Sequence, residues 1–279
     1  METIRTKWMR RLTLCLTPLV FSPTDVTIYH AVPSSVYSQS KDDSAMTIVT
    51  YNIRGCRDDD GIADPSLVAS VLAELNADVI ALQEVDYRLP RSRFVDQVAS
   101  IAGSLEMNYV YAPSLSLVIG TYGNALLSRH PILHAEVLSL PGSWEPRSLL
   151  DVTLDWNGTP LHVYVTHLGV HKSEHPEQIA FLHSHLQENS ENTGILLGDF
   201  NILPNDPLLD SLRTVYDDPL HRQEQRLITL KGKHSFKEVD RILLSPNLLF
   251  VEAAAPAIGP SDHFPLWMKI KPNALAMQE

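Results

Sequence analysis

Cysteine, basic side chains and long apolar runs are all scarce in this sequence of 279 residues. The two cysteines, Cys15 and Cys56, form neither a zinc-binding nor a disulfide pattern, so we expect both thiols to be idle. The apolar stretch at residues 12–21 holds about ten apolar-leaning residues, too few for a helix that spans a bilayer. What remains is a globular chain with a sizeable core, as its hydrophobic content of 44% also indicates.

The shortage of basic residues limits the partners of the chain. Subtracting the five basic and four acidic residues of positions 1–45 from the totals of 22 and 33 leaves 17 basic and 29 acidic residues, a net charge of −12. Tight binding to a long polyanion, regardless of its sequence, needs a basic surface. The composition therefore disfavours such a protein, but it does not exclude a nuclease, because a metal ion can supply local positive charge.

Residues 1–45 are expected to be a tail outside the folded domain: a basic start and a short apolar stretch are followed at residues 22–45 by a polar, linker-like segment without periodicity. Three interpretations stay open: a signal peptide without a clear cleavage site, an extension before a true start at Met46, and a genuine tail. The domain is predicted to cover residues 46–272, followed by a C-terminal tail at 273–279. We expect a cytoplasmic protein, or a secreted or membrane-associated one if residues 1–25 act as a signal.

After Met46, short strands and helices alternate without an internal repeat. Helices are predicted from Pro65 and Pro176, near residues 207–212, and on the apolar positions Phe94 to Leu105. The first helix has its apolar face on Leu67, Val68, Val71, Leu72 and Leu75. Strands are predicted at residues 47–52, 78–82, 109–112, 123–128, 132–138, 149–156, 161–166, 195–197, 239–244, 250–254 and 264–270, with a tight turn at Asn157-Gly158. This order indicates an α/β (α+β) fold of layered sheets covered by helices.

The stretch ILLGDFNILP places two polar side chains after a buried strand. Residues i and i+2 of extended backbone point to the same side, so Asp199 and Asn201 are expected to project together. Such a pair can hold a metal ion, a water or a phosphoryl oxygen. The alternative is an ordinary Asx turn, which is the more common meaning of an isolated Asp-x-Asn.

Similar polar residues recur near the ends of the other predicted strands. Each has an ordinary structural explanation when taken singly, but their number favours one shared site. They are Asn52, Glu84, Asn124, Arg147, His167, Asp199 with Asn201, Asp240, and Asp262 with His263.

In order and spacing, these residues resemble the endonuclease/exonuclease/phosphatase superfamily, which includes deoxyribonuclease I and bacterial sphingomyelinases. The resemblance implies a four-layer α/β/β/α sandwich of two packed mixed β-sheets, with the site at the strand ends. It spans residues 46–270 and is closest to small bacterial metal-dependent hydrolases. It is carried by TYNIRG (50–55), LQEVD (82–86), YGNALLSRHPI (122–132), EPRSLLDVTL (145–154), THLG (166–169), LLGDFNILP (196–204), VDRILLSP (239–246) and SDHFPL (261–266).

The resemblance implies a metal site made of oxygen ligands. Glu84 and Asn52 are the predicted ligands, with Asp262 joining directly or through water. A hard, all-oxygen set suits Mg²⁺, or Mn²⁺, rather than Zn²⁺. Arg147 and Asn124 are predicted to contact the phosphate.

Five further residues are predicted to be catalytic. His263 and Asp240 form a carboxylate–imidazole pair with a general-base or phosphate-binding role. Asp199 and Asn201 orient the attacking water and a phosphoryl oxygen, and His167 stabilises the pentacovalent state or assists the leaving group. The exonuclease III-like branch uses instead a Tyr-x-Pro-Asn-Gly-like stretch, whose absence here weakens an abasic-site repair function.

The sequence therefore predicts a Mg²⁺-dependent phosphoester hydrolase, acting as a monomer without a protein partner. Whether its substrate is a nucleic acid or a phospholipid or small phosphoester stays open, and a non-catalytic binding module on the same fold is the minor alternative. A zinc stripe at His167, His171 and His175 is disfavoured, because Gly169 and Pro176 interrupt the helix that it requires.

Overall fold

The computed structural model describes residues 28–29, 45–232 and 235–273. The predicted tails therefore lie outside the described residues, except for Ile28, Tyr29, Ala45 and Asn273. Within the described part, no helix is long and apolar enough to cross a membrane.

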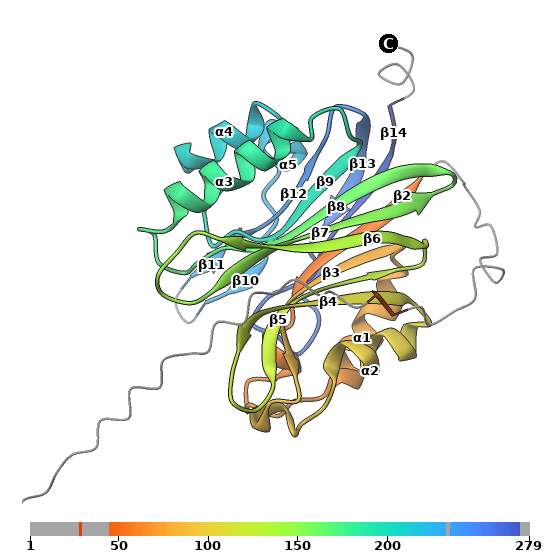
Figure 1. The fold of residues 1–279 in the computed structure, drawn as a ribbon, viewed down its shortest axis with the longest axis vertical. Helices are drawn as coiled ribbons and strands as arrows, with labels where there is room; N and C mark the ends of the chain where they lie inside the picture. Colours follow the sequence, from red (N-terminus) through yellow and green to blue (C-terminus); the bar gives the residue numbers. More distant parts are fainter. Residues whose placement is uncertain (1–27, 30–44, 233–234, 274–279) are drawn as a thin grey trace, which may run out of the picture.

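Two mixed sheets pack face to face between two layers of helices (Figure 1). Strands β2 and β3 are parallel, as are β8 and β9, and the other pairs in these sheets are antiparallel. The first sheet has the order β1 (Ile28–Tyr29), β4 (Asn108–Ser116), β5 (Thr121–Ser128), β3 (Val79–Tyr87), β2 (Met46–Asn52), β14 (Leu266–Pro272), β13 (Leu248–Ala254). The second has the order β12 (Asp240–Leu244), β9 (Gly194–Asp199), β8 (Thr159–His167), β7 (Arg147–Trp156), β6 (Ile132–Leu140); β10 (Leu230–Lys231) pairs with β11 (Phe236–Lys237).

Helices cover the outer face of each sheet, which confirms the predicted four-layer α/β/β/α sandwich (Figure 1). The first sheet carries α1 (Pro65–Leu75) and α2 (Gln97–Leu105), and the second carries α3 (His175–Glu188) and α4 (Asp210–Arg213). Shorter elements are α5 (Pro219–Arg222), η2 (Arg54–Cys56), η3 (Pro90–Ser92) and η4 (Pro207–Leu209). The first helix begins as expected, with Asp64 accepting a hydrogen bond from the Ser66 amide and Pro65 in the first turn.

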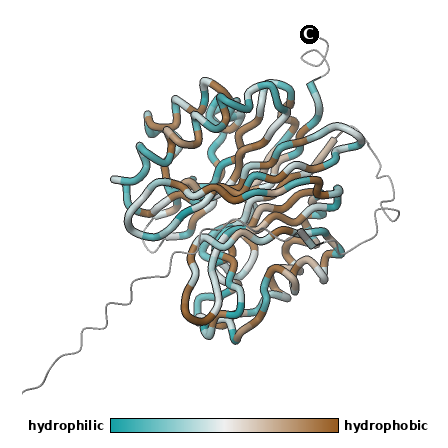
Figure 2. The backbone as a smooth tube through the Cα atoms, viewed as in Figure 1, coloured by the Kyte–Doolittle hydropathy of each residue, from teal (hydrophilic) through white to brown (hydrophobic). Residues whose placement is uncertain are grey.

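The central strands are apolar on both faces because both faces are covered. In β2, Ile48 packs between the sheets and Val49 packs under the helices. In β9, Leu197 lies between the sheets and Leu196 faces α3 and α4. Figure 2 shows these apolar strands running through the middle of the molecule. Strands buried on both faces are continuous apolar runs, which is how they could be predicted.

Most predicted elements are confirmed, including the turn at Asn157 and Gly158, where both residues have positive φ. Other predictions are wrong in detail. Phe94 is not on a helix: it has φ 61°, its side chain is 59% exposed, and α2 begins at Gln97 after the Asp96 cap. Leu67 is 49% exposed rather than on the buried face of its helix, because its position in α1 turns it to solvent. The last strand begins at Leu266, not at residue 264.

The short strand β1 joins the predicted tail to the domain. Ile28 and Tyr29 pair with Val110 and Tyr109 of β4. The rings of Tyr29 and Tyr109 stack with centroids 4.7 Å apart. Two residues of the predicted tail thus extend the first sheet at its edge.

Candidate active site

Three of the predicted residues lie side by side at the end of the second sheet. The register places His167 of β8 opposite Asp199 of β9, and Asp199 opposite Asp240 of β12. Gly198 makes this alignment possible: it has φ 147°, and a Cβ there would collide with the Thr166 carbonyl of the neighbouring strand. One row of chemically active side chains therefore results from the strand pairing itself.

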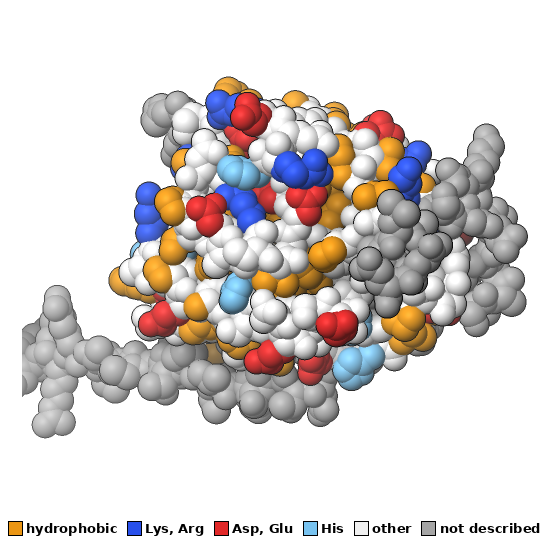
Figure 3. All heavy atoms as spheres, turned by 90° about the horizontal axis from the view of Figure 1, so that it is seen from above, with side chains coloured by type: hydrophobic (Ala, Val, Ile, Leu, Met, Phe, Trp, Pro, Cys, Tyr) orange, Lys and Arg blue, Asp and Glu red, His pale blue; other side chains and the backbone are white. Residues whose placement is uncertain are grey.

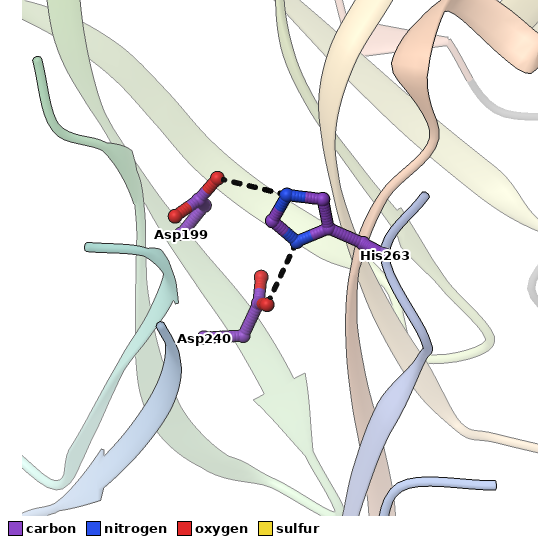
Figure 4. A group of neighbouring side chains, drawn as sticks. All are labelled: Asp199, Asp240 and His263. Atoms are coloured by element: carbon purple, nitrogen blue, oxygen red, sulfur yellow. Dashed lines mark hydrogen bonds and ion pairs between the residues drawn. The ribbon is translucent and has the colours of Figure 1, made fainter. Parts of the chain in front are cut away.

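His263 enters this row from the first sheet, just before β14 (Figure 4). Its Nδ1 lies 2.9 Å from Asp240 Oδ2, and its Nε2 lies 3.6 Å from Asp199 Oδ2. All three side chains are buried. Burial alone would lower the pKa of His263, but Asp240 and Asp199 outweigh it and raise the pKa to about 10. The ring is therefore a doubly protonated cation that donates a hydrogen bond to Asp240 and forms an ion pair with Asp199.

Asn52 connects this row to Glu84. Its Nδ2 donates to Asp199 Oδ2 and to Glu84 Oε1, both at 3.0 Å. Ser261 holds the loop in place, since its hydroxyl donates to the Asn52 carbonyl at 2.8 Å and accepts from the His263 amide at 3.1 Å. The buried Asn52 carboxamide thus links the first sheet to Asp199 of the second sheet.

His167 is neutral, whereas His263 is charged. Its pKa lies well below the ordinary value because the ring is buried, and because Arg147 and His263 add positive charge nearby. Arg147 Nη1 lies 2.9 Å from His167 Nδ1. Since a guanidinium only donates, Nδ1 must be the acceptor, and the proton is on Nε2, 3.5 Å from Asp199 Oδ2. The neutral ring is therefore a fixed hydrogen-bond donor toward the site.

Asp199 is the centre of the arrangement. Its Oδ2 faces Asn52 and both imidazoles, and its Oδ1 accepts from the Asn201 amide at 2.9 Å. Burial and the neighbouring Asp240 raise its pKa. A carboxylate with a raised pKa can accept a proton more readily than an ordinary surface aspartate.

Glu84 does not end its strand, as the sequence had suggested, because β3 continues to Tyr87. Instead, the pairing with β5 shifts register between Leu82 and Val85, and Glu84 adopts φ 59° at this bulge. A bulge re-aims the side chain that it contains. Here the carboxylate reaches Asn52 while remaining partly exposed.

The expectation that Asn201 follows Asp199 on extended backbone is wrong. Asn201 has φ 52°, and the Asp199 carboxylate accepts from its amide, which is an Asx turn. The Asn201 side chain donates to the Leu168 carbonyl at 3.1 Å. Its predicted role on the substrate stays a prediction.

Two other predicted residues lie at the edge of the row. Asp262 Oδ2 is 3.8 Å from Arg54 Nε. Asn124 is buried, and its amide donates to the Ser148 carbonyl at 3.4 Å, beside Arg147. Their roles as metal ligand and phosphate contact stay predictions, and Asn124 has the geometry to position the strand that carries Arg147.

The three histidines of the disfavoured zinc stripe do not share a helix. His167 ends β8, and His171 follows in a turn, where its ring stacks on Trp144 with centroids 4.1 Å apart. His175 begins α3 and bonds to the Gly169 carbonyl at 2.6 Å. The three histidines form no stripe, because Gly169 lies in the loop between β8 and α3 and no helix runs through all three.

The donor set fits a hard divalent cation. Among the described residues, one group of acidic and histidine side chains has ligand atoms within 4.8 Å of one another: Asp199, Asp240 and His263. Asp240 Oδ1 is buried without a hydrogen-bond partner in the described structure. Both nitrogens of the His263 imidazole face carboxylates, so the ligand atoms left for a cation are oxygens. Asn52 Oδ1 already accepts from the Arg54 amide at 3.1 Å, which leaves the carboxylates of Asp240 and Glu84 as the main donors, as Mg²⁺ or Mn²⁺ prefers.

Sequence reasoning missed Thr229, whose hydroxyl accepts from the Asp240 amide at 3.1 Å. Thr229 lies in an irregular segment whose apolar residues have neither helical nor strand spacing, so no sequence pattern indicated its role. Ser261 was part of a recognised motif, but its hydroxyl had no assigned role.

The chain belongs to the endonuclease/exonuclease/phosphatase family, whose model matches residues 49–263. Members of this family hydrolyse phosphoester bonds, and the fold is generally metal-dependent. The uncharacterized protein YbhP of Escherichia coli K12 is 30% identical over 139 residues, 46% of this chain and 54% of that protein. The match thus spans about half the length of this relative.

Solved structures share the fold. An endonuclease/exonuclease/phosphatase from Beutenbergia cavernae has a TM-score of 0.68 and 22% identity, covering 82% of this chain and 72% of that one. A mannosyl-6-phosphatase of Bacteroides thetaiotaomicron has a TM-score of 0.66 and 17% identity, covering 81% and 99%. At these identities the likeness concerns the fold alone.

Proposed function

We propose that this protein hydrolyses a phosphodiester or phosphomonoester with the help of Mg²⁺ or Mn²⁺. The observation that carries the proposal is the position of Asp199, which lies between one neutral and one charged imidazole and accepts a hydrogen bond from Asn52. When bound, the metal would neutralise charge on the phosphoryl group and lower the pKa of a water. Glu84 and Asn52 would hold it, with Asp262 or the free oxygen of Asp240 nearby.

The chain's own residues divide the remaining work. Asp199 orients the attacking water and accepts its proton. The charged His263 and the Arg147 guanidinium bind phosphoryl oxygens, and Asp240 keeps the His263 ring charged and oriented. His167 donates its Nε2 proton toward the developing negative charge.

A lipid or small phosphoester suits this chain better than a long nucleic acid. The net charge is −11, and the face in Figure 3 intersperses acidic and basic side chains. A nuclease remains the second candidate, supported by the family to which the chain belongs. We propose that the enzyme acts as a monomer.

Hydrolysis of bis(4-nitrophenyl) phosphate tests the proposal. We expect turnover with MgCl₂ or MnCl₂ and none after EDTA, with recovery when excess metal is added. A panel of plasmid DNA, abasic duplex, sphingomyelin and phosphoinositides then separates the substrate classes. Binding to any of these without hydrolysis under all metal conditions would identify a non-catalytic module instead.

A further inference from the structure

A pocket of about 530 Å³ opens beside the proposed catalytic row. Glu84 and Arg147 line the end that joins the row. The remaining wall comes from four separate segments: Leu89 with η3, the β4–β5 hairpin, the loop before β7, and the loop after β8. Its size falls within the range of pockets that bind small molecules, so it can hold the organic part of a substrate whose phosphate lies at the catalytic end.

Most of this wall is apolar. It includes Leu89, Pro90, Leu115, Leu117 and Val170. Leu117 is 51% exposed and Val170 is 63% exposed, so apolar side chains here are held open to solvent.

The hairpin tip continues the same apolar surface. Val118 and Ile119, next to Leu117, are 92% and 54% exposed. The tip is a defined turn, in which the Leu117 amide donates to the Gly120 carbonyl at 3.1 Å. A run of three large exposed apolar residues beside a pocket is typical of a binding surface.

The cations of the pocket are already paired. Arg91 makes a two-pronged bond to the buried Asp86, at 2.9 and 2.6 Å, and its guanidinium lies 5.3 Å from the centre of the Tyr122 ring. Arg147 Nη2 lies 3.2 Å from Glu145.

With Glu84 added, the charged residues lining the pocket are two arginines and two glutamates. Of the two arginines, only Arg147 lies at the catalytic end, and it is expected to bind the reacting phosphate. The wall therefore offers no surplus positive charge for a second phosphate.

We propose that this pocket binds an uncharged, largely apolar group esterified to the reacting phosphate, either an aromatic ring or a hydrocarbon chain. This rests on the proposed function and narrows its substrate class. Substrates with a second phosphate next to the first, such as oligonucleotides, are selected against, because their charge would meet an apolar wall.

Binding of phosphonates tests the pocket without relying on turnover. Calorimetry with Mg²⁺ would compare methyl-, phenyl- and octylphosphonate, which share one head group. We expect the phenyl or octyl compound to bind at least about tenfold more tightly than the methyl compound. The stronger of the two identifies the ring or the chain as the natural group. Equal affinity of all three would overturn the proposal.

Two exposed wall residues supply the variants. Leu117→Asp and Val170→Asp should abolish the preference for the larger phosphonates over methylphosphonate. Leu133→Asp is the matched control, because Leu133 is also exposed, at 56%, but lies on β6 outside the pocket lining. If the control loses the preference equally, or the wall variants keep it, the pocket is not the binding site.

Hydrolysis of methyl, phenyl and octyl 4-nitrophenyl phosphate separates this proposal from the one on which it rests. If no ester is hydrolysed with any metal while the phosphonate preference holds, the proposed catalytic function fails and the pocket stands. If all three esters are hydrolysed, and the kcat/KM for each ester is the same in wild type as in Leu117→Asp, the hydrolase stands and the pocket assignment fails.

Discussion

Two clusters of carboxylates and imidazoles lie on opposite faces of the five-stranded sheet. On the outer face, Asp151 lies between His162 and His185, at 3.6 and 3.2 Å, beneath α3. On the inner face, His263 lies between Asp240 and Asp199. The outer cluster shares one carboxylate between two imidazoles, whereas in the inner cluster one imidazole is shared between two carboxylates.

The proposed function assigns the reaction to the inner cluster and leaves the outer cluster a structural role. In the inner cluster, acid groups outnumber the cation that pairs them, and Asp240 keeps a buried oxygen without a partner. In the outer cluster, both oxygens of Asp151 face imidazole nitrogens in the middle of a strand, and the buried atom without a hydrogen-bond partner is a nitrogen, His162 Nδ1. Residue types in proximity are thus common to both clusters, and it is the surplus of acceptors at strand ends that distinguishes the inner one.

Matched substitutions in the two clusters should give the largest contrast. Asp199→Asn should lower kcat/KM for bis(4-nitrophenyl) phosphate by about 10²–10⁴-fold, because the proton acceptor is lost. Asp151→Asn should change it by less than about threefold and act on stability instead. Steady-state kinetics and melting temperatures of both variants provide the check. Equal kinetic losses would show that the outer cluster also serves the reaction.

Glu84 lies beyond the inner cluster and tests how far the site extends. Glu84→Gln keeps the shape and removes the charge, so activity should fall by about 10²-fold or more. Raising Mg²⁺ should recover little of it, whereas Glu136→Gln, beside the outer cluster on β6, should behave as wild type. Near-normal turnover of Glu84→Gln at millimolar Mg²⁺ would remove Glu84 from the metal site.

A double-mutant cycle addresses the coupling within the inner cluster. Asp240→Asn removes the carboxylate that holds the His263 ring charged and oriented, and His263→Ala removes the ring. Because the two act as one unit, the double variant should be about as slow as His263→Ala alone. Measured kcat/KM values for all four proteins decide the question, and log losses that simply add would mean independent action.

The smallest expected effect is the loss at acidic pH of the stability that Asp151 contributes in the outer cluster. Burial favours a higher pKa for Asp151, but the adjacent imidazoles of His162 and His185 outweigh it and lower the pKa below 3.8. The stability that this carboxylate contributes is thus present above 3.8 and is lost as pH falls through the lowered pKa.

Urea unfolding at about pH 5, 4 and 3 measures this loss. The free energy of unfolding of wild type should exceed that of Asp151→Asn at pH 5, and the gap should shrink toward pH 3. A gap that stays constant over this range contradicts the assignment.

The features that depend on the spacing of apolar residues, or on polar residues at strand ends, could be predicted from the sequence. The strand before Asp199 is an unbroken apolar run because both of its faces are buried, and Asp64-Pro65 marks a helix start by its own chemistry. The polar residues at strand ends include several that the structure brings together, and their catalytic and metal-binding roles stay predictions.

The remaining features depend on contacts between distant segments. The bulge at Glu84 exists only against β5, and the hydroxyl of Thr229 gains its role from a strand that follows it. Phe94 fits a helical spacing, but left-handed backbone at that residue separates it from the helix. Strand β1 is two residues long, too short to show a period.

The left-handed backbone at Glu84 has a consequence for protein engineering. A side chain larger than glycine in this conformation carries strain on the order of 1 kcal/mol. Replacement by glycine would relax the strand and remove the carboxylate in the same step. A directed-evolution campaign that screens only for heat resistance would therefore enrich well-folded, inactive proteins at this position, and its libraries should keep residue 84 constant.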